Sequence, residues 1–155
     1  MWSLPRHEVL KLLSEDASSL FAAEIAEQLR RSNDRTFRKW LANLQMLGLI
    51  QYEPSGRIVA TPSGQRIGSA LYVNVIYLRT VWCVAEIGSP ATLDQIRHKA
   101  GGDLNPKYLQ DAARAGHVSK KFAYSGLKYR NTYRLKYLGA ELLVTYAPLG
   151  ELFRC

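Results

Sequence analysis

The chain has 155 residues, 47% of them hydrophobic, which suits one or two small domains with cores of their own. Its formal net charge of +8 and its pI of about 9.7 favour polyanionic partners, nucleic acid before an anionic membrane. The two cysteines form no Cys-x-x-Cys pair, which argues against a zinc site or a disulfide framework and favours a reducing cytoplasm.

Positive charge is concentrated in the second half of the chain. Residues 1–70 carry nine Lys/Arg against seven Asp/Glu, whereas residues 71–155 carry twelve against six. The second half is therefore expected to attract phosphate groups more strongly.

No segment is predicted to enter a membrane. The longest mostly apolar run, residues 70–87, contains Asn74, Arg79 and Glu86, so it predicts a buried helix instead of a membrane span. The N-terminus is charged early and is too broken to be a signal peptide.

Two helices are predicted before residue 32. The first begins at Leu4 and Pro5, because proline suits the first turn of a helix, and its apolar face continues to about Ser14. The second carries Phe21, Ile25 and Leu29 at helical spacing, with small alanines that allow a third helix to cross it closely.

The stretch from Ser32 to Gly64 predicts a third helix and a β-hairpin. Ser32 and Asn33 are candidate caps for the helix, and Gly48 can end it. Strands at residues 49–52 and 58–60 enclose a Pro-Ser-Gly turn, and Thr61 with Pro62 can open a further helix. The apolar stripe of the third helix consists of Phe37, Leu41, Leu44 and Leu47.

Three helices, a hairpin and a further helix, with a basic outer face on the third helix, resemble the winged helix-turn-helix DNA-binding proteins. The resemblance covers residues 5–70. It implies that the third helix is a recognition helix, that the hairpin is a wing, and that the ligand is double-stranded DNA. Another small α+β fold is the alternative.

The second half repeats this order. Helices are predicted at residues 71–87, 93–100, 106–116 and 138–146, with strands at 118–124 and 129–135, and the first of these helices can continue the one that begins at Pro62. The Gly-Leu-Ile at 48–50 corresponds to the Gly-His-Val at 116–118, an offset of 68 residues. After the hairpins, residues 61–64 correspond to residues 136–139, an offset of 75 residues. The second wing is therefore predicted to be seven residues longer than the first.

The predicted fold class is therefore mainly α with small β-hairpin wings, an α+β chain of two tandem winged-helix modules. The first module spans residues 1–70. The second spans residues 71–155 and starts with a long connecting helix at 71–87. One winged helix followed by a helical dimerisation region is the alternative.

The predicted third helix supplies the first set of DNA-contacting residues. Arg35 is the best candidate base reader, because its planar guanidinium can bind guanine with two hydrogen bonds. Asn33 either reads adenine or serves as a helix cap, and Trp40 is better explained by core packing than by a phosphate contact. The remaining candidates in this half are Thr36, Arg38, Lys39 and, at the wing tip, Arg57.

In the second half the predicted wing carries more candidate DNA-contacting residues than the predicted helix at 106–116. The outer face of the helix at 106–116, which is shorter than the third helix, carries Lys107, Tyr108 and Gln110. Asp111 lies beside them and is unfavourable near phosphates. The wing carries Lys120, Lys121, Tyr124, Lys128, Arg130 and Arg134, and half of its aromatic residues are expected in the core. We therefore expect the predicted third helix, with Asn33 to Lys39, to specify sequence and the second wing to hold the DNA backbone. The alternative for the wing is a solvated hairpin whose lysines protect an edge strand.

Catalysis is not expected. His7, His98 and His117 are scattered, and no phosphate-binding loop, His-Glu-x-x-His pair or acidic cluster suited to magnesium occurs. The chain is thus predicted to be no enzyme and to need no cofactor and no metal.

The predicted function is sequence-specific transcriptional regulation, with repression by promoter occupancy the favoured form. A plasmid or phage replication or partition initiator and a winged-helix protein-interaction module are the alternatives. The expected partner is double-stranded DNA, with a homodimer slightly favoured and a location in the cytoplasm, on the nucleoid when bound to DNA.

Overall fold

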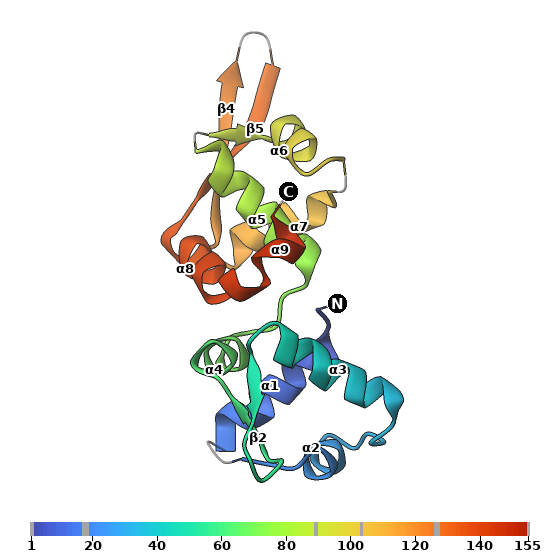
Figure 1. The fold of residues 1–155 in the computed structure, drawn as a ribbon. Helices are drawn as coiled ribbons and strands as arrows, with labels where there is room; N and C mark the ends of the chain where they lie inside the picture. Colours follow the sequence, from blue (N-terminus) through green and yellow to red (C-terminus); the bar gives the residue numbers. More distant parts are fainter. Residues whose placement is uncertain (1, 17–18, 89, 103, 126–127, 155) are drawn as a thin grey trace. The chain divides into compact units, whose positions relative to one another are not determined.

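The computed structural model describes residues 2–16, 19–88, 90–102, 104–125 and 128–154, apart from the side chains of Asp16, Ala123, Ser125, Lys128 and Tyr129. The fold divides into two units, Met1–Tyr72 and Val73–Cys155, each with its own helices and antiparallel sheet (Figure 1). The predicted α+β class is confirmed.

Unit 1, residues 1–72, has three helices, a β-hairpin and a fourth helix. The strands pair antiparallel with Ile50 opposite Ala60, and Leu20 adds a two-way backbone bridge to Ile58 of the second strand. The elements are α1 (Leu4–Asp16), α2 (Ala22–Gln28), α3 (Arg35–Met46), β1 (Ile50–Tyr52), β2 (Ile58–Ala60) and α4 (Pro62–Ser69).

The core of unit 1 contains most of the predicted apolar faces, although Phe21 is 38% exposed and Leu47 is only partly buried. Phe37, Leu41 and Leu44 of α3 are buried, and α1 packs along α4. The rest of this core comes from the first two helices, the hairpin and α4. It includes Val9, Leu10, Leu13, Ile25, Leu49, Ile50, Ile58 and, from α4, Ile67.

The start of α3 differs from the prediction. The cap is Asp34, whose carboxylate accepts a hydrogen bond from the backbone N–H of Phe37 at 3.0 Å; Ser32 and Asn33 lie outside the helix. Asp34 takes this role because it is extended and stands immediately before the first helical residue. The predicted cap of α4 is confirmed, since the Thr61 hydroxyl accepts from the N–H of Gly64 at 3.2 Å.

Unit 2, residues 73–155, contains a three-stranded antiparallel sheet of order β3-β5-β4. Beyond the predicted elements it has a short strand before its second helix and two short helical segments at the end of the chain. The elements are α5 (Val75–Ile87), β3 (Ala91–Thr92), α6 (Leu93–Lys99), α7 (Pro106–Arg114), β4 (Val118–Ser125), β5 (Lys128–Leu135), α8 (Tyr137–Thr145), η1 (Ala147–Leu149) and α9 (Gly150–Phe153).

The predicted long connecting helix at 71–87 is wrong in its first four residues. Helix α4 ends at Ser69, and α5 begins only at Val75, where the side chain of Asn74 accepts the N–H of Tyr77 at 2.8 Å. Leu71, an apolar residue of the predicted helix, is 88% exposed. Helix α5 is therefore the first helix of unit 2.

The two units repeat local backbone geometry at the ends of their third helices. Gly48 and Gly116 both have a positive φ, 73° and 79°, which glycine adopts without penalty. In each unit the next residue donates back to the helix at 2.9 Å: Leu49 to the Leu44 carbonyl, and His117 to the Ala112 carbonyl.

The same correspondence continues where each hairpin meets the following helix. The Thr61 N–H donates to the Leu49 carbonyl, and the Lys136 N–H donates to the His117 carbonyl, both at 3.0 Å. A Cβ on Gly64 would overlap the Leu49 carbonyl oxygen, and one on Gly139 would overlap the His117 oxygen. Equivalent positions in the two units thus meet equivalent steric demands.

Candidate nucleic-acid interface

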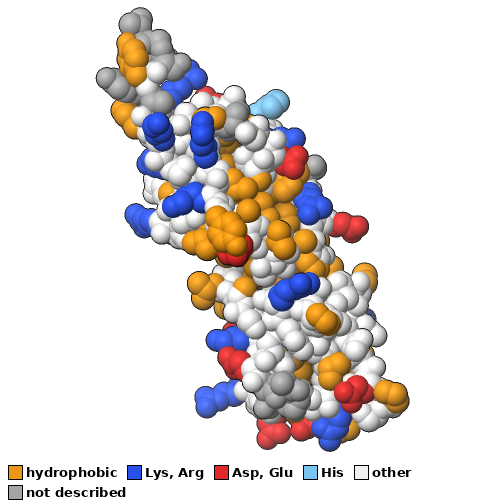
Figure 2. Space-filling view, turned by 90° about the vertical axis from the view of Figure 1, so that its left-hand side faces the viewer, with side chains coloured by type: hydrophobic (Ala, Val, Ile, Leu, Met, Phe, Trp, Pro, Cys, Tyr) orange, Lys and Arg blue, Asp and Glu red, His pale blue; other side chains and the backbone are white. Residues whose placement is uncertain are grey.

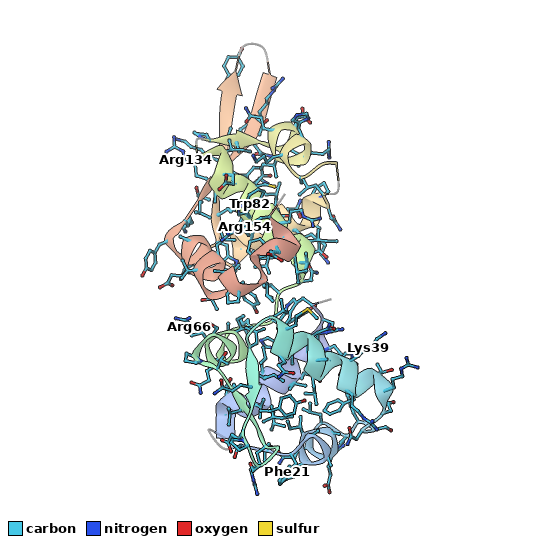
Figure 3. The ribbon with its side chains drawn as sticks, in the orientation of Figure 1. Phe21, Lys39, Arg66, Trp82, Arg134 and Arg154 are labelled. Atoms are coloured by element: carbon cyan, nitrogen blue, oxygen red, sulfur yellow. The ribbon has the colours of Figure 1, made fainter. Side chains whose placement is uncertain are left out.

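The outer face of α3 gathers four predicted contact residues. Arg35, Thr36, Arg38 and Lys39 are all exposed, while the helix face made by Phe37 and its apolar partners is buried. Lys39 extends from α3 away from the body of unit 1 (Figure 3). Residues three and four apart lie on one side of a helix, so Arg35, Arg38 and Lys39 form one cationic face.

Trp40 packs against its neighbours in unit 1 and is not part of the cationic outer face of α3. Its ring meets Phe37 edge to face with centroids 6.0 Å apart, and the Arg31 guanidinium lies 5.0 Å from its centroid. Arg31 also approaches the Glu8 carboxylate at 3.8 Å. These contacts bind the turn before α3 to the helix itself.

Two predicted residues of unit 1 lie apart from the α3 face. Asn33 is exposed in the segment before the helix, where it has no capping duty. Arg57 is partly buried: its guanidinium donates to the Ser19 carbonyl at 3.1 Å and lies 4.7 Å from the ring centroid of Phe21. A DNA contact by Arg57 remains a prediction, and it would compete with these internal partners.

In α7, Lys107 and Gln110 are exposed as predicted, but Tyr108 is not. Its hydroxyl accepts a hydrogen bond from the Asn74 side chain at 2.9 Å, and its ring meets that of Tyr77 edge to face. Tyr108 is therefore partly buried against the core of unit 2 instead of fully exposed, and a DNA contact by its side chain stays a prediction.

Tyr77 connects α7 to the start of the wing. Its hydroxyl oxygen and Nδ1 of His117 are 2.6 Å apart and share a hydrogen bond. Burial, followed by the nearby charge of Asp111, raises the pKa of Tyr77 to about 12, and burial lowers the pKa of His117. Tyr77 therefore stays protonated and His117 stays neutral near pH 7, which suits a structural hydrogen bond.

One face of the long hairpin β4–β5 carries most of its cations. Strand residues alternate between faces, and the register pairs Ala123 with Arg130, Lys121 with Thr132 and Ser119 with Arg134. Lys121, Arg130 and Arg134 therefore share one face, and all three are exposed. We call this set the wing cation row. At about 3.3 Å per residue it extends roughly 13 Å along β5.

Lys120 lies on the opposite face of the hairpin, because it pairs with the buried Tyr133. Phe122 and Tyr124 share that face but are 64% and 60% exposed. Of the wing aromatics, half of which were expected in the core, Tyr133 is buried and these two are exposed.

The wing as a whole is free of acidic residues. Residues 117–137 contain six Lys/Arg and no Asp or Glu, and on the face shown in Figure 2 Lys and Arg side chains gather at the upper left, toward the wing. The Lys128 side chain, also predicted to contact DNA, lies outside what the structure describes.

Sequence reasoning missed Arg30, which lies in the turn between α2 and α3. Among the residues that the structure describes, it is the one non-glycine with a positive φ, 53°. The pairing of Gly48 with Gly116 would have matched Arg30 to His98. The helix starts in the structure, 71 positions apart for α1 and α5, match it to Gly101 instead.

Two other kinds of site were sought in the described parts of the chain. No group of three or more His, Cys, Asp or Glu side chains there is placed to hold a metal ion. None of the helices described there has the length and apolar character needed to cross a bilayer.

Comparison with known proteins gives little. No protein-family model matches the chain, and no curated protein matches it. Among solved structures, the chain is similar to ScpB from Mycobacterium tuberculosis, with 14% sequence identity over 86% of this chain and 94% of that chain and a TM-score of 0.39. A TM-score this low supports no inference about fold or function.

Proposed function

We propose that the chain binds double-stranded DNA through two winged-helix modules, with α3 reading bases. The observation that supports this most is the outer face of α3, where Arg35, Arg38 and Lys39 are exposed on a helix whose other face is fixed in the core. A cationic face on a rigid helix matches the major groove, which is wide enough to admit an α-helix.

The position of each side chain along α3 suggests its role. Arg35 and Thr36 are in the first turn, the part of a recognition helix that contacts base edges. Arg38 and Lys39 follow one turn later and suit phosphates, which position the protein without reading sequence. Within residues 30–39 the one acidic residue is Asp34, whose carboxylate is engaged as the cap of the helix.

The repeated geometry of unit 2 supports a second module on the same chain. The matching turns at Gly48 and Gly116 and the matching close approaches at Gly64 and Gly139 are what a duplicated winged helix requires. Two modules on one chain can occupy two half-sites. We propose a sequence-specific transcriptional regulator that works in the cytoplasm on the nucleoid, with repression by promoter occupancy the favoured mode; the homodimer stays a prediction.

A protein-interaction module is the second candidate. The observation in its favour is the exposed apolar surface of α8, where Tyr137, Leu138 and Val144 are at least half exposed. Exposed apolar patches mark interaction sites in some proteins. The cationic face of α3 has no role in this candidate, which is why we rank it second.

Salt-dependent binding separates the two candidates. The affinity of the full chain for a random-sequence duplex is measured between about 50 and 200 mM salt, where release of counterions should lower it steeply. Arg38→Ala and Lys39→Ala should each reduce the salt slope by about 0.9. Arg66→Ala is the matched control, since this exposed arginine lies on the opposite side of unit 1 from Lys39 (Figure 3). If the chain has no affinity for duplex DNA at the lowest salt, the DNA-binding proposal is ruled out and the protein-interaction module remains as the candidate.

A further inference from the structure

Arg30 adopts a backbone conformation that disfavours its own side chain. Its φ of 53° lies in the left-handed region, where the Cβ of an L-residue crowds the following carbonyl oxygen. Glycine and, less often, asparagine occupy such positions without this penalty. Backbone geometry therefore does not account for an arginine at this position, and the role of its side chain has to.

Unit 2 contains the same turn with glycine in that position. The Arg30 N–H donates to the Glu27 carbonyl at 3.0 Å, and the Gly101 N–H donates to the His98 carbonyl at 3.1 Å. The residues that follow, Arg31 and Gly102, also make equivalent bonds, at 2.8 and 2.9 Å, to residues five positions earlier. Gly101 has a φ of 74°. The turn therefore forms with glycine, and nothing in its backbone requires arginine.

The Arg30 side chain makes no polar interaction with the described residues that would offset this strain. It is exposed, and within the described part of the chain no hydrogen bond or ion pair holds it. Its neighbour Arg31 differs, because it pairs with Glu8 and lies over Trp40 of α3. That contact fixes the turn beside the helix whose outer face carries Arg38 and Lys39.

We propose that Arg30 is a DNA-phosphate contact, retained in a strained position because its charge extends the cationic face of α3. The inference rests on the proposed function and adds a residue to the same interface. Strained residues concentrate where function uses them. A replacement that relieves the strain should therefore stabilise the protein and weaken DNA binding at the same time.

The test uses three variants of the full chain, Arg30→Gly, Arg30→Ala and Arg30→Lys. Arg30→Gly should raise the midpoint of thermal unfolding of unit 1 by roughly 4–8 °C, lower the affinity for a random duplex about three- to tenfold near 0.1 M salt, and reduce the salt slope by about 0.9. Arg30→Ala should show the same loss of affinity without the thermal gain. Arg30→Lys should keep the wild-type salt slope.

The reciprocal substitution Gly101→Arg controls for the strain and should lower the midpoint for unit 2. The proposal is overturned if Arg30→Gly binds the duplex with wild-type affinity and salt slope while the wild type itself binds. It is also overturned if Arg30→Gly unfolds at the wild-type temperature or below it, since the strain would then be absent. If the wild type has no duplex affinity, the proposed function fails and this inference fails with it.

Discussion

His7 connects the first and last helices of unit 1 through a single ring nitrogen. Its side chain is 4% exposed, and Nε2 donates to the carbonyl oxygens of Ile67 and Ala70 at 3.0 and 2.9 Å. The nitrogen that donates must carry the proton, so the neutral ring satisfies this arrangement. Burial lowers the pKa of His7 below its ordinary value of 6.5.

This pKa gives a pH-dependent stability with a defined sign. Below pH 6.5 the unfolded chain binds a proton at His7 that the folded chain does not, so acidification favours unfolding until the folded pKa is passed. We expect the free energy of unfolding to fall as pH drops below about 6.5, and to fall less in His7→Gln, measured by denaturant titration. Equal pH dependence in the two proteins would contradict this, because His117, whose pKa burial also lowers, is present in both.

Gly64 and Gly48 allow a comparison of steric and conformational demands on glycine. A Cβ at Gly64 would overlap the Leu49 carbonyl, whereas one at Gly48 meets nothing within 4 Å but stays at a φ of 73°. Gly64→Ala should cost about 3 kcal/mol or more, and Gly48→Ala about 1–2 kcal/mol. Chemical denaturation measures both, and a milder effect at Gly64 would show that hairpin and helix do not approach as described.

At the scale of elements, two neighbouring residues at the start of α3 should differ in their contribution to stability. Asp34→Ala removes the cap and should cost about 1 kcal/mol of stability. Asn33→Ala removes an exposed side chain without an internal role and should change stability by less than about 0.5 kcal/mol. Equilibrium unfolding of both variants measures these losses of stability. A larger loss in Asn33→Ala than in Asp34→Ala would identify Asn33 as the cap.

The two faces of the second wing have different expected roles. Replacing the wing cation row, Lys121, Arg130 and Arg134, by alanine should reduce the salt slope of duplex binding by about 2–3 and leave sequence preference unchanged, because phosphates carry no sequence information. Lys120→Ala is the matched control, since Lys120 is exposed on the opposite face. Equal effects of Lys120 and Lys121, each replaced singly, would argue against a one-faced contact.

Local signals predicted most of the elements, and long-range contacts explain the errors. The helix ending at Gly48 and the Thr61 cap were predictable because their determinants lie within a few residues of each other. The partial burial of Tyr108 was not, because its hydroxyl bonds to Asn74, 34 residues away in the chain. The exposure of Phe122 was not either, since strand alternation places it on the core-side face but does not say how far the covering helices extend.

At the scale of the whole molecule, two units that share local backbone features carry different charge. Helices α1 and α5 each have 13 residues and start 71 positions apart, yet the second half of the chain has three times the net positive charge of the first. Cations concentrate on α3 in unit 1 and on the long wing in unit 2. This difference supports base reading by unit 1 and backbone binding by unit 2.

Selection of bound sequences from a random duplex pool tests this division most directly. We expect the wild type to recover a defined motif, Arg35→Ala to relax preference at one or a few positions of it, and the triple variant of the wing cation row to recover the same motif with weaker binding. Recovery of no motif by the wild type, or loss of the motif in the wing variant with its retention in Arg35→Ala, would contradict the account.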